Sequence, residues 1–211
     1  MPPSAEIERI LRLSPVMPVV IIEEAEVAPE LARAFVRGGI RAVEITLRTP
    51  AALAAIEAIA RDVPEIAVGA GTVLSADDLG AAASAGATFA ISPGATPALL
   101  SAAASGPIPY LPAVATASEV MAGLAHGYHC FKFFPASAAG GTAMLKAFAG
   151  PFPRARFCPT GGITQESVRS YLELSNVLCV GGSWLSPSEA VAARDWKRIE
   201  ALAARAAASR T

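Results

Sequence analysis

The sequence predicts an α/β protein in which residues 1–211 form a single (β/α)8 barrel domain that begins with a short helix. Short apolar runs rich in β-forming residues alternate with helical patterns along the chain, and this alternation is typical of a parallel sheet. Eight such strand–helix units favour closure of the sheet into a barrel. An open doubly wound sheet is the alternative, but no Gly-x-Gly-x-x-Gly pattern follows the first run to support a dinucleotide fold.

Each element has a local reason in the sequence. The expected strands are short apolar runs, because parallel strands are covered on both faces, and they lie at residues 16–22, 42–47, 66–69, 89–91, 108–111, 130–134, 156–158 and 177–180. Helices are expected between and after them at residues 28–37, 50–61, 76–85, 97–104, 118–126, 141–148, 165–172 and 188–208. Ser75 and Thr164 mark two helix starts, and glycines such as Gly86 and Gly127 follow helix ends. An amphipathic segment at residues 5–13 predicts the short helix before the first strand.

Charge and cysteine content exclude several classes of protein. The 17 Lys and Arg and 18 Asp and Glu leave a formal net charge of −1, so there is no electrostatic basis for binding nucleic acid or an anionic membrane. The apolar run at residues 16–22 is too short to span a bilayer and lacks the features of a signal peptide. Cys130, Cys158 and Cys179 have no Cys-x-x-Cys spacing and fall on expected buried strands, so we expect a reduced, cytoplasmic protein.

A lysine in the middle of an aromatic strand is the most informative chemical feature. Cys130, Lys132 and Phe134 share one face of this strand, and Phe131 and Phe133 share the other. No Asp or Glu lies within five residues of the lysine to pair with it. Burial favours the neutral amine, which is the form that attacks a carbonyl carbon to make a Schiff base. A lysine that reaches solvent at a strand end is the structural alternative.

The second expected strand carries polar side chains on one face. Its apolar residues suit the outer face, and its inner face carries Glu44, Thr46 and Arg48. Polar groups that point into a core are costly unless they serve a ligand or one another. We therefore expect Arg48, near the carboxyl end of the strand, to bind a substrate carboxylate, and Glu44, deeper in the barrel, to carry protons. An internal Glu44–Arg48 ion pair is the alternative.

Glycines gather at the carboxyl ends of three strands. The third strand ends in 69-Gly-Ala-Gly-Thr-72, where the backbone can be approached closely and Thr72 offers a hydroxyl. The seventh and eighth strands are followed by the glycine pairs 161–162 and 181–182. Barrels often bind phosphate through backbone N–H groups in these two places. The sequence therefore predicts a phosphate site there, with tight strand-to-helix turns as the alternative.

No metal site is expected. His126 and His129 are the only histidines, and they lie before the sixth strand, on the side of a barrel opposite to the catalytic end. The cysteines and carboxylates elsewhere do not complete a metal-ligand spacing. We expect both histidines to be structural.

Several segments resemble one known family in the same order along the chain. They are Val43-Glu44-Ile45-Thr46-Leu47-Arg48, Gly69-Ala70-Gly71-Thr72-Val73, Ile91-Ser92-Pro93-Gly94, Phe131-Lys132-Phe133-Phe134-Pro135-Ala136, Phe157-Cys158-Pro159-Thr160-Gly161-Gly162-Ile163 and Gly181-Gly182-Ser183-Trp184-Leu185. Together they are similar to the bacterial 2-keto-3-deoxy-6-phosphogluconate aldolase/4-hydroxy-2-oxoglutarate aldolase family, over roughly residues 14 to 187.

This resemblance implies a role for each matched residue. Lys132 matches the Schiff-base lysine and Glu44 the general acid/base. The groups around the substrate match Arg48, Thr72, Pro93 and Thr160, and the phosphate site matches Gly161, Gly162, Gly182 and Ser183. The resemblance also implies a homotrimeric barrel that acts on a small phosphorylated keto-acid without a metal or other cofactor.

The chain departs from the family pattern in two places. Ala113 stands where a glycine is expected, and residues 137–139 are smaller and less polar than usual. Since neither is a matched catalytic position, we expect them to change loop details only.

Galactonate-specific relatives resemble the chain less, because they tend to lack Thr-Leu-Arg after the glutamate and have an apolar residue in place of Thr160. A non-catalytic phosphosugar-binding barrel would have no use for the lysine and glutamate.

Overall fold

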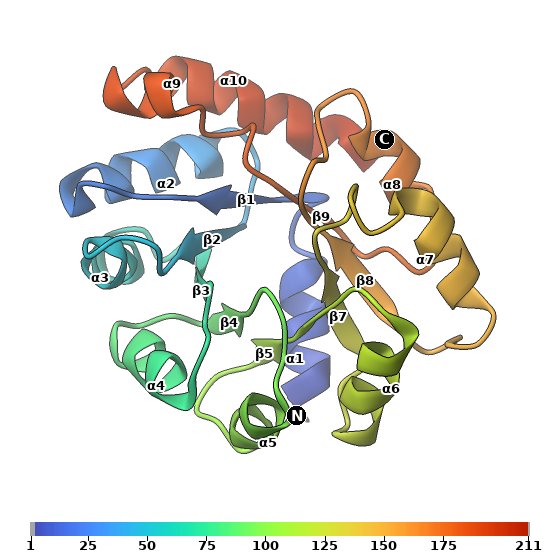
Figure 1. Cartoon of the computed structure of the whole chain (residues 1–211). Coiled ribbons are helices and arrows are strands. Elements are labelled where there is room, and N and C mark those ends of the chain that lie inside the picture. Colours follow the sequence, from blue (N-terminus) through green and yellow to red (C-terminus); the bar gives the residue numbers. More distant parts are fainter. Residues whose placement is uncertain (1–2, 211) are drawn as a thin grey trace.

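The computed structural model describes residues 3–210 and shows parallel strands at the centre of a ring of helices (Figure 1). The strands, in chain order, are β1 (Val16–Val20), β2 (Ala42–Thr46), β3 (Ala67–Gly71), β4 (Phe89–Ile91), β5 (Tyr110–Leu111), β6 (Ala113–Val114), β7 (Cys130–Phe133), β8 (Arg156–Pro159) and β9 (Val180–Gly182). The helices are α1 (Pro3–Leu11), α2 (Ala28–Arg37), α3 (Ala52–Asp62), α4 (Ala76–Ser84), α5 (Pro97–Ala104), α6 (Ala117–Ala125), α7 (Gly141–Ala149), α8 (Val168–Leu172), α9 (Ser188–Ala192) and α10 (Trp196–Ala207), with short 3-10 turns at Ala25–Val27 and Ala208–Arg210.

The strands form a curled parallel sheet in two parts. One part has six strands in the order β5-β4-β3-β2-β1-β9, and the other has three in the order β6-β7-β8. Pro112, which lacks an N–H group, separates β5 from β6. The expected strand at residues 108–111 corresponds to β5, and β6 was not expected from the sequence. The expected α/β architecture with an N-terminal helix is confirmed, whereas the hydrogen-bonded ladder is divided rather than a single ring of eight strands.

The expected and observed elements differ mainly near the C-terminus. The helix expected at residues 188–208 is two helices, because Arg194 has a left-handed backbone (φ 52°) and Asp195 starts α10 by accepting a hydrogen bond from the Arg198 N–H at 3.1 Å. The helix expected from residue 165 begins at Val168, after a turn in which the Thr164 N–H donates to Ser167 Oγ at 2.9 Å. The last strand starts at Val180 rather than at residue 177.

Two apolar clusters lie on opposite faces of the strands. Phe131 and Phe133 point outward into the larger cluster, between the strands and the helices. Cys130 points inward into a smaller cluster with buried residues of α1 and the other strands. This division confirms the two strand faces that the period of two predicts.

Helix α1 closes the amino-terminal end of the strands. It lies in the middle of the ring of helices (Figure 1), and its buried side chains Ile7, Ile10 and Leu11 pack inside the ring with Met17 and Phe89. Because this end is filled by apolar side chains, the carboxyl ends of the strands remain as the place for a site.

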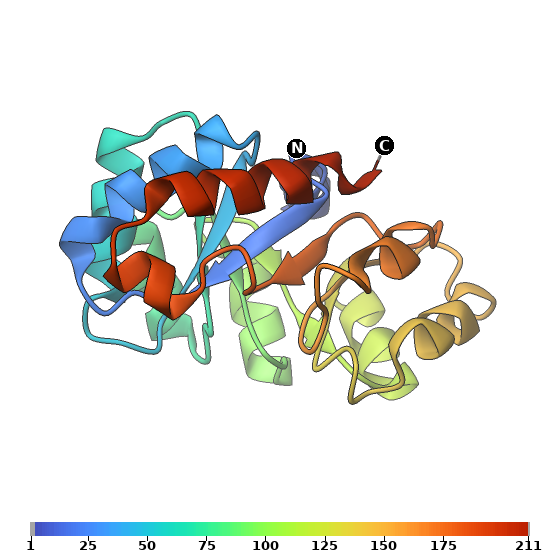
Figure 2. The same ribbon diagram turned by 90° about the horizontal axis from the view of Figure 1, so that it is seen from above.

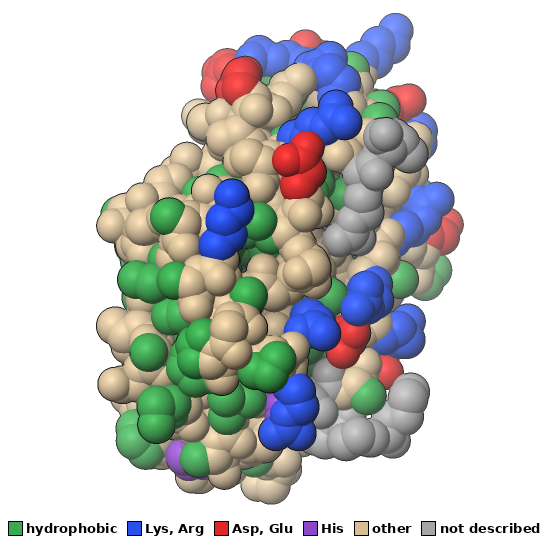
Figure 3. All heavy atoms as spheres, turned by 90° about the vertical axis from the view of Figure 1, so that its right-hand side faces the viewer, with side chains coloured by type: hydrophobic (Ala, Val, Ile, Leu, Met, Phe, Trp, Pro, Cys, Tyr) green, Lys and Arg blue, Asp and Glu red, His purple; other side chains and the backbone are tan. Residues whose placement is uncertain are grey.

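The surface carries charges of both signs. The C-terminal helix α10 lies beside α2 (Figures 1 and 2), where Arg37 Nε donates to Glu200 Oε2 at 2.8 Å. On the face drawn in Figure 3, basic side chains are separated by other residues and several lie beside acidic ones. None of the helices in residues 3–210 has both the length and the apolar character that crossing a membrane requires.

Candidate active site

A buried ion pair joins the two residues that were expected to be catalytic. Lys132 on β7 donates from Nζ to Glu44 Oε1 at 2.9 Å and to Oε2 at 3.2 Å. The exposed fraction is 7% for the lysine side chain and 2% for the glutamate side chain. These residues are 88 positions apart in the chain and lie on strands of different sheet parts. A buried charge pair adds little to stability on balance, so its presence here indicates chemistry.

Arg48 does not take part in this pair. Its Nε donates instead to Thr72 Oγ1 at 3.3 Å, and its side chain is exposed. The alternative of an internal Glu44–Arg48 ion pair is therefore wrong. The alternative of a solvent-exposed lysine is also wrong, because Lys132 is buried and held by Glu44.

Glycine at position 71 is what allows Glu44 to reach the lysine. A Cβ atom at Gly71 would lie 2.1 Å from Glu44 Oε1 and 2.6 Å from its Cγ. Gly71 is at the end of β3, paired in register with Thr46 of β2. Any larger residue would push the carboxylate out of its place. The Phe134 ring centroid lies 5.5 Å from Lys132 Nζ, a distance that suits an ammonium over an aromatic face.

The rim above the pair carries the remaining polar groups of β2 and β3. Thr72 has a left-handed backbone (φ 59°), an uncommon conformation for a residue with a β-branched side chain. This turn directs its hydroxyl to Arg48. Thr46 lies one step along the inner face from Glu44. Its hydroxyl donates to the carbonyl oxygen of Val20 at 3.0 Å, so its hydrogen bond is made within the sheet.

Thr160 and Pro93 lie at the ends of two other strands. Thr160 is buried just after β8, and its Oγ1 donates to the carbonyl oxygen of Cys158 at 3.5 Å. Cys158 is the register partner of Lys132 on the neighbouring strand, so Thr160 lies one inner-face step beyond the lysine. Pro93 is half-buried, two residues after β4. In residues 3–210, no hydrogen bond or ion pair joins Pro93 to the other expected site residues.

The two glycine loops lie side by side. An isolated parallel bridge joins Thr160 to Gly181, and it brings the loop after β8 next to the end of β9. Gly161 (φ 103°) and Gly162 (φ 72°) have left-handed backbones that favour glycine. Within the described part of the chain, the N–H groups of Gly162 and Ser183 donate to no acceptor. They are therefore available to an anion.

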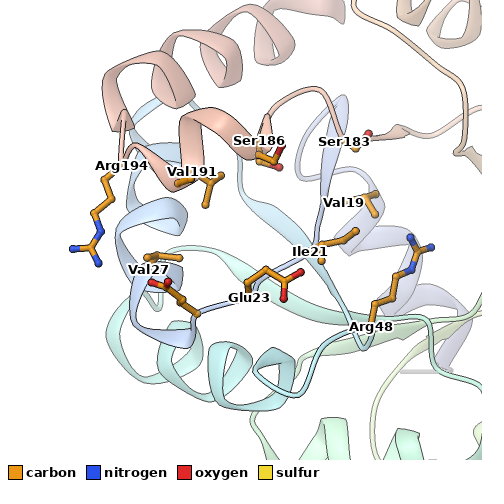
Figure 4. Close-up of a pocket in the computed structure, with 12 residues that line it drawn as sticks. Val19, Ile21, Glu23, Val27, Arg48, Ser183, Ser186, Val191 and Arg194 are labelled. Carbon is orange, nitrogen blue, oxygen red and sulfur yellow. The ribbon is translucent and has the colours of Figure 1, made fainter.

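A cavity of about 600 Å³ opens beside the loop that follows β9 and is lined by Ser183 of that loop. Figure 4 shows Arg48 at one end of this cavity and Arg194 at the other, with Ser183 and Ser186 on one wall. Glu23 extends into it (Figure 4), and its apolar lining residues are Val19, Ile21, Val27, Val191 and Ala192. Two residues expected to bind substrate, Arg48 and Ser183, thus face the same space.

Within the described residues, the histidines and cysteines show no arrangement that suggests a metal site, although Cys158 Sγ lies 4.0 Å from Thr160 Oγ1. His126 Nδ1 is hydrogen-bonded to the carbonyl oxygen of Ala122 at 2.8 Å, within α6 and its cap. The cysteines are buried thiols of the inner cluster, and burial raises the pKa of Cys130 to about 12. Among residues 3–210 no group of three or more His, Cys, Asp or Glu side chains is placed to hold a metal ion.

Both departures from the family pattern lie closer to the site than the sequence indicated. Ala113 is the register partner of Lys132 between β6 and β7. Ser137 donates from Oγ to the carbonyl oxygen of Gly162 at 2.9 Å. Neither contact has a local signal in the sequence, because each joins segments that only the folded sheet brings together.

Comparison with known proteins agrees with this geometry. The family model described as KDPG and KHG aldolase matches residues 7–202. The chain belongs to this aldolase family.

Curated relatives of the chain are named as aldolases of this family. The chain is 53% identical over 196 residues to a KHG/KDPG aldolase of Escherichia coli K12, covering 93% of this chain and 92% of that protein. It is 52% identical over 204 residues to a 2-dehydro-3-deoxy-phosphogluconate aldolase of Dickeya dadantii, covering 97% and 96%.

A solved structure in the aldolase family has the same fold. The KDPG aldolase of Legionella pneumophila superposes with a TM-score of 0.93 at 48% identity, covering 95% of this chain and 98% of that one. Its crystal structure holds pyruvate captured at low pH as a covalent carbinolamine intermediate.

Proposed function

We propose that this chain is a class I aldolase that cleaves 2-keto-3-deoxy-6-phosphogluconate to pyruvate and glyceraldehyde 3-phosphate. Cleavage of 4-hydroxy-2-oxoglutarate to pyruvate and glyoxylate is the second reaction that we propose for the same site. The buried contact between Lys132 and Glu44 is the single observation that carries this proposal. Family membership and the names of the relatives support it.

The first half of the reaction makes an imine. Glu44 accepts a proton from the Lys132 ammonium, and the neutral amine adds to the C2 ketone of the keto-acid to give a carbinolamine. The carbinolamine hydroxyl then leaves as water after taking up a proton, and a protonated imine remains. The short distances from Nζ to both carboxylate oxygens suit this proton transfer.

The second half breaks the carbon–carbon bond. The imine cation draws the electron pair of the C3–C4 bond, while Glu44, directly or through a water molecule, takes the proton of the C4 hydroxyl. Glyceraldehyde 3-phosphate leaves, and the enamine of pyruvate takes up a proton at C3. Addition of water to the resulting imine releases pyruvate and restores Lys132. Because the imine is the electron sink, this scheme has no step for a metal ion or an organic cofactor.

The rim residues position the substrate in this scheme. Arg48 and Thr72, already in contact with each other, bind the carboxylate of the pyruvate half. Pro93 and Thr160 line the pocket around the reacting carbons. The phosphate lies in the loops after β8 and β9, on the backbone of Gly161, Gly162 and Gly182 and on Ser183. The unused N–H groups of Gly162 and Ser183 within the described chain, and the bridge between the two loops, support this placement.

We further propose that the two sheet parts belong to one closed (β/α)8 barrel. β5 and β6 are separated only by Pro112, and the parallel bridges Phe157–Val177 and Thr160–Gly181 link β8 to the segment that ends in β9.

A homotrimer and a cytoplasmic location are the remaining parts of the proposal. They are supported by the family and by the buried free thiols of the described residues. The partner is a small keto-acid phosphate, not nucleic acid or a membrane.

Reductive trapping tests the central step. Incubation with pyruvate and borohydride should add one pyruvyl-derived group, and mass spectrometry of peptides should place it on Lys132. The variant Lys146→Ala, which removes an exposed lysine of α7, is the matched control and should be labelled fully. Absence of label in the wild-type protein would leave a non-catalytic phosphosugar-binding barrel. Faster cleavage of the 6-phosphogalactonate epimer would favour the galactonate-specific aldolase of the same family.

A further inference from the structure

The chain segments that follow β7 and β8 stay hydrogen-bonded beyond the ends of these strands. The Ala136 N–H donates to the carbonyl oxygen of Thr160 at 2.8 Å, and the Ser137 N–H donates to that of Gly161 at 3.0 Å. The next carbonyl, that of Gly162, accepts from Ser137 Oγ at 2.9 Å. Three successive carbonyls of the glycine loop therefore face residues 136–137. Only the third of these contacts depends on a side chain.

The direction of these carbonyls decides where the loop N–H groups point. In a planar trans peptide the C=O and the following N–H point in opposite directions. The carbonyl of Gly161 faces Ser137, so the N–H of Gly162 points away from it. In the same way, the carbonyl of Gly162 held by the Ser137 hydroxyl turns the N–H of Ile163 away. Both N–H groups donate to no acceptor within residues 3–210. Peptide geometry directs both of them away from the β7 segment.

The glycine loop sits closely on Ser137. A Cβ atom at Gly162 would lie 2.8 Å from both Cβ and Oγ of Ser137. Gly162 has a left-handed backbone, and glycine has several conformations of similar energy, so it needs an outside contact to select one. Ser137 supplies that contact from the loop that directly follows the lysine strand.

We infer that Ser137 is a positioning residue that sets the orientation of the phosphate-binding loop. This inference rests on the proposed aldolase function and adds one side chain to its phosphate site. Ser137 acts through the Gly162–Ile163 peptide and does not itself contact the reacting atoms. Its effect is therefore confined to the phosphorylated half of the substrate. The pyruvate half, bound at Lys132 and Arg48, does not depend on it.

Three serine variants test this role. Ser137→Ala removes the hydroxyl and Ser137→Thr keeps it. Ser170→Ala, on α8, removes an exposed hydroxyl that also donates to a carbonyl, that of Ser167 at 2.7 Å, and within residues 3–210 has no hydrogen bond to the glycine loop. For Ser137→Ala we expect the KM for the phosphorylated substrate to rise about three- to ten-fold, which corresponds to the loss of one hydrogen bond. The kcat should stay within about two-fold of the wild-type value. Ser137→Thr and Ser170→Ala should both behave like the wild type.

Two further readouts separate positioning from a general structural effect. Calorimetric binding of inorganic phosphate should weaken by the same factor in Ser137→Ala, whereas solvent exchange of the pyruvate methyl protons should stay unchanged. An unchanged KM and phosphate affinity in Ser137→Ala, or an equal loss in the exchange reaction, would overturn the inference. Failure of the proposed function itself would look different, because the wild-type protein would then form no imine. Phosphate binding would still test Ser137 in that case.

Discussion

The inner face of the sheet has two ends of opposite character. At the amino-terminal end, Cys130 and Ala42 pack with α1 in a dry apolar cluster. One inner-face step further, about 6.6 Å along each strand, these same strands carry Lys132 and Glu44 as a buried ion pair. Hydrophobic packing stabilises the first end, whereas the second holds charges whose desolvation opposes folding. An apolar cluster and a buried ion pair therefore occupy adjacent layers of the same strands.

Replacing Lys132 should have the largest effect. Lys132→Met removes the only amine that can form the imine, so we expect no measurable cleavage and no trapping with pyruvate. It also leaves Glu44 buried without its partner, so thermal unfolding should occur at a lower temperature than in the wild type. The double variant Lys132→Met/Glu44→Gln should recover most of this stability while remaining inactive. Labelling of another lysine in Lys132→Met would show that the nucleophile has been assigned wrongly.

Glu44→Gln should have the second largest effect. Glutamine keeps the shape and the hydrogen bonding of glutamate but cannot accept a proton, so we expect kcat to fall by about 10²-fold or more. Exchange of the pyruvate methyl protons with solvent should slow in parallel, because it uses the same base. Trapping of the pyruvate imine should persist. If exchange remains normal, a water molecule held by Thr72 or Thr160 carries the proton instead.

Changes at Arg48 should affect binding more than chemistry. Arg48→Ala should raise the KM for the keto-acid by about ten-fold or more, since a charge-assisted contact to the carboxylate is lost. Arg48→Lys keeps the charge without the planar fork and should lie between the wild type and the alanine variant. Because Arg48 is exposed, neither variant should shift the unfolding temperature appreciably. Equal kinetics in both variants and the wild type would make Arg48 a structural residue only.

Changes at the amino-terminal end should leave the kinetics intact. Leu11→Ala at the fully buried end of α1 should lower the free energy of unfolding by about 2–5 kcal/mol. Leu53→Ala is the matched control on α3, where the leucine is 38% exposed. It should lower the free energy of unfolding by much less than Leu11→Ala does. The KM and kcat of both folded variants should match those of the wild type. A large change in kcat for Leu11→Ala would show that the two layers are coupled.

Much of the fold was predictable because its signals are local. The period of two put Cys130 on one face of its strand and Phe131 and Phe133 on the other, and the two clusters confirm this division. Helices α2 and α5 begin and end where their patterns predict. The sequence fails to predict an element boundary where one residue's backbone conformation sets it. At Arg194, a left-handed φ divides the last helical pattern into two helices. Such a conformation depends on the packing of both neighbouring helices, so the pattern of apolar residues does not report it.

The sequence by itself determined which residues could carry the chemistry, because a lysine in an aromatic strand and polar groups on an inner strand face are unusual in a core. Only the tertiary structure decided how they combine. It paired Glu44 with Lys132, which lies 88 residues away in the chain, and left Arg48 to contact Thr72. It also brought the Ser137 hydroxyl to the carbonyl of Gly162. Side-chain period tells which face a residue occupies, but the curvature and register of the sheet decide which strand it meets.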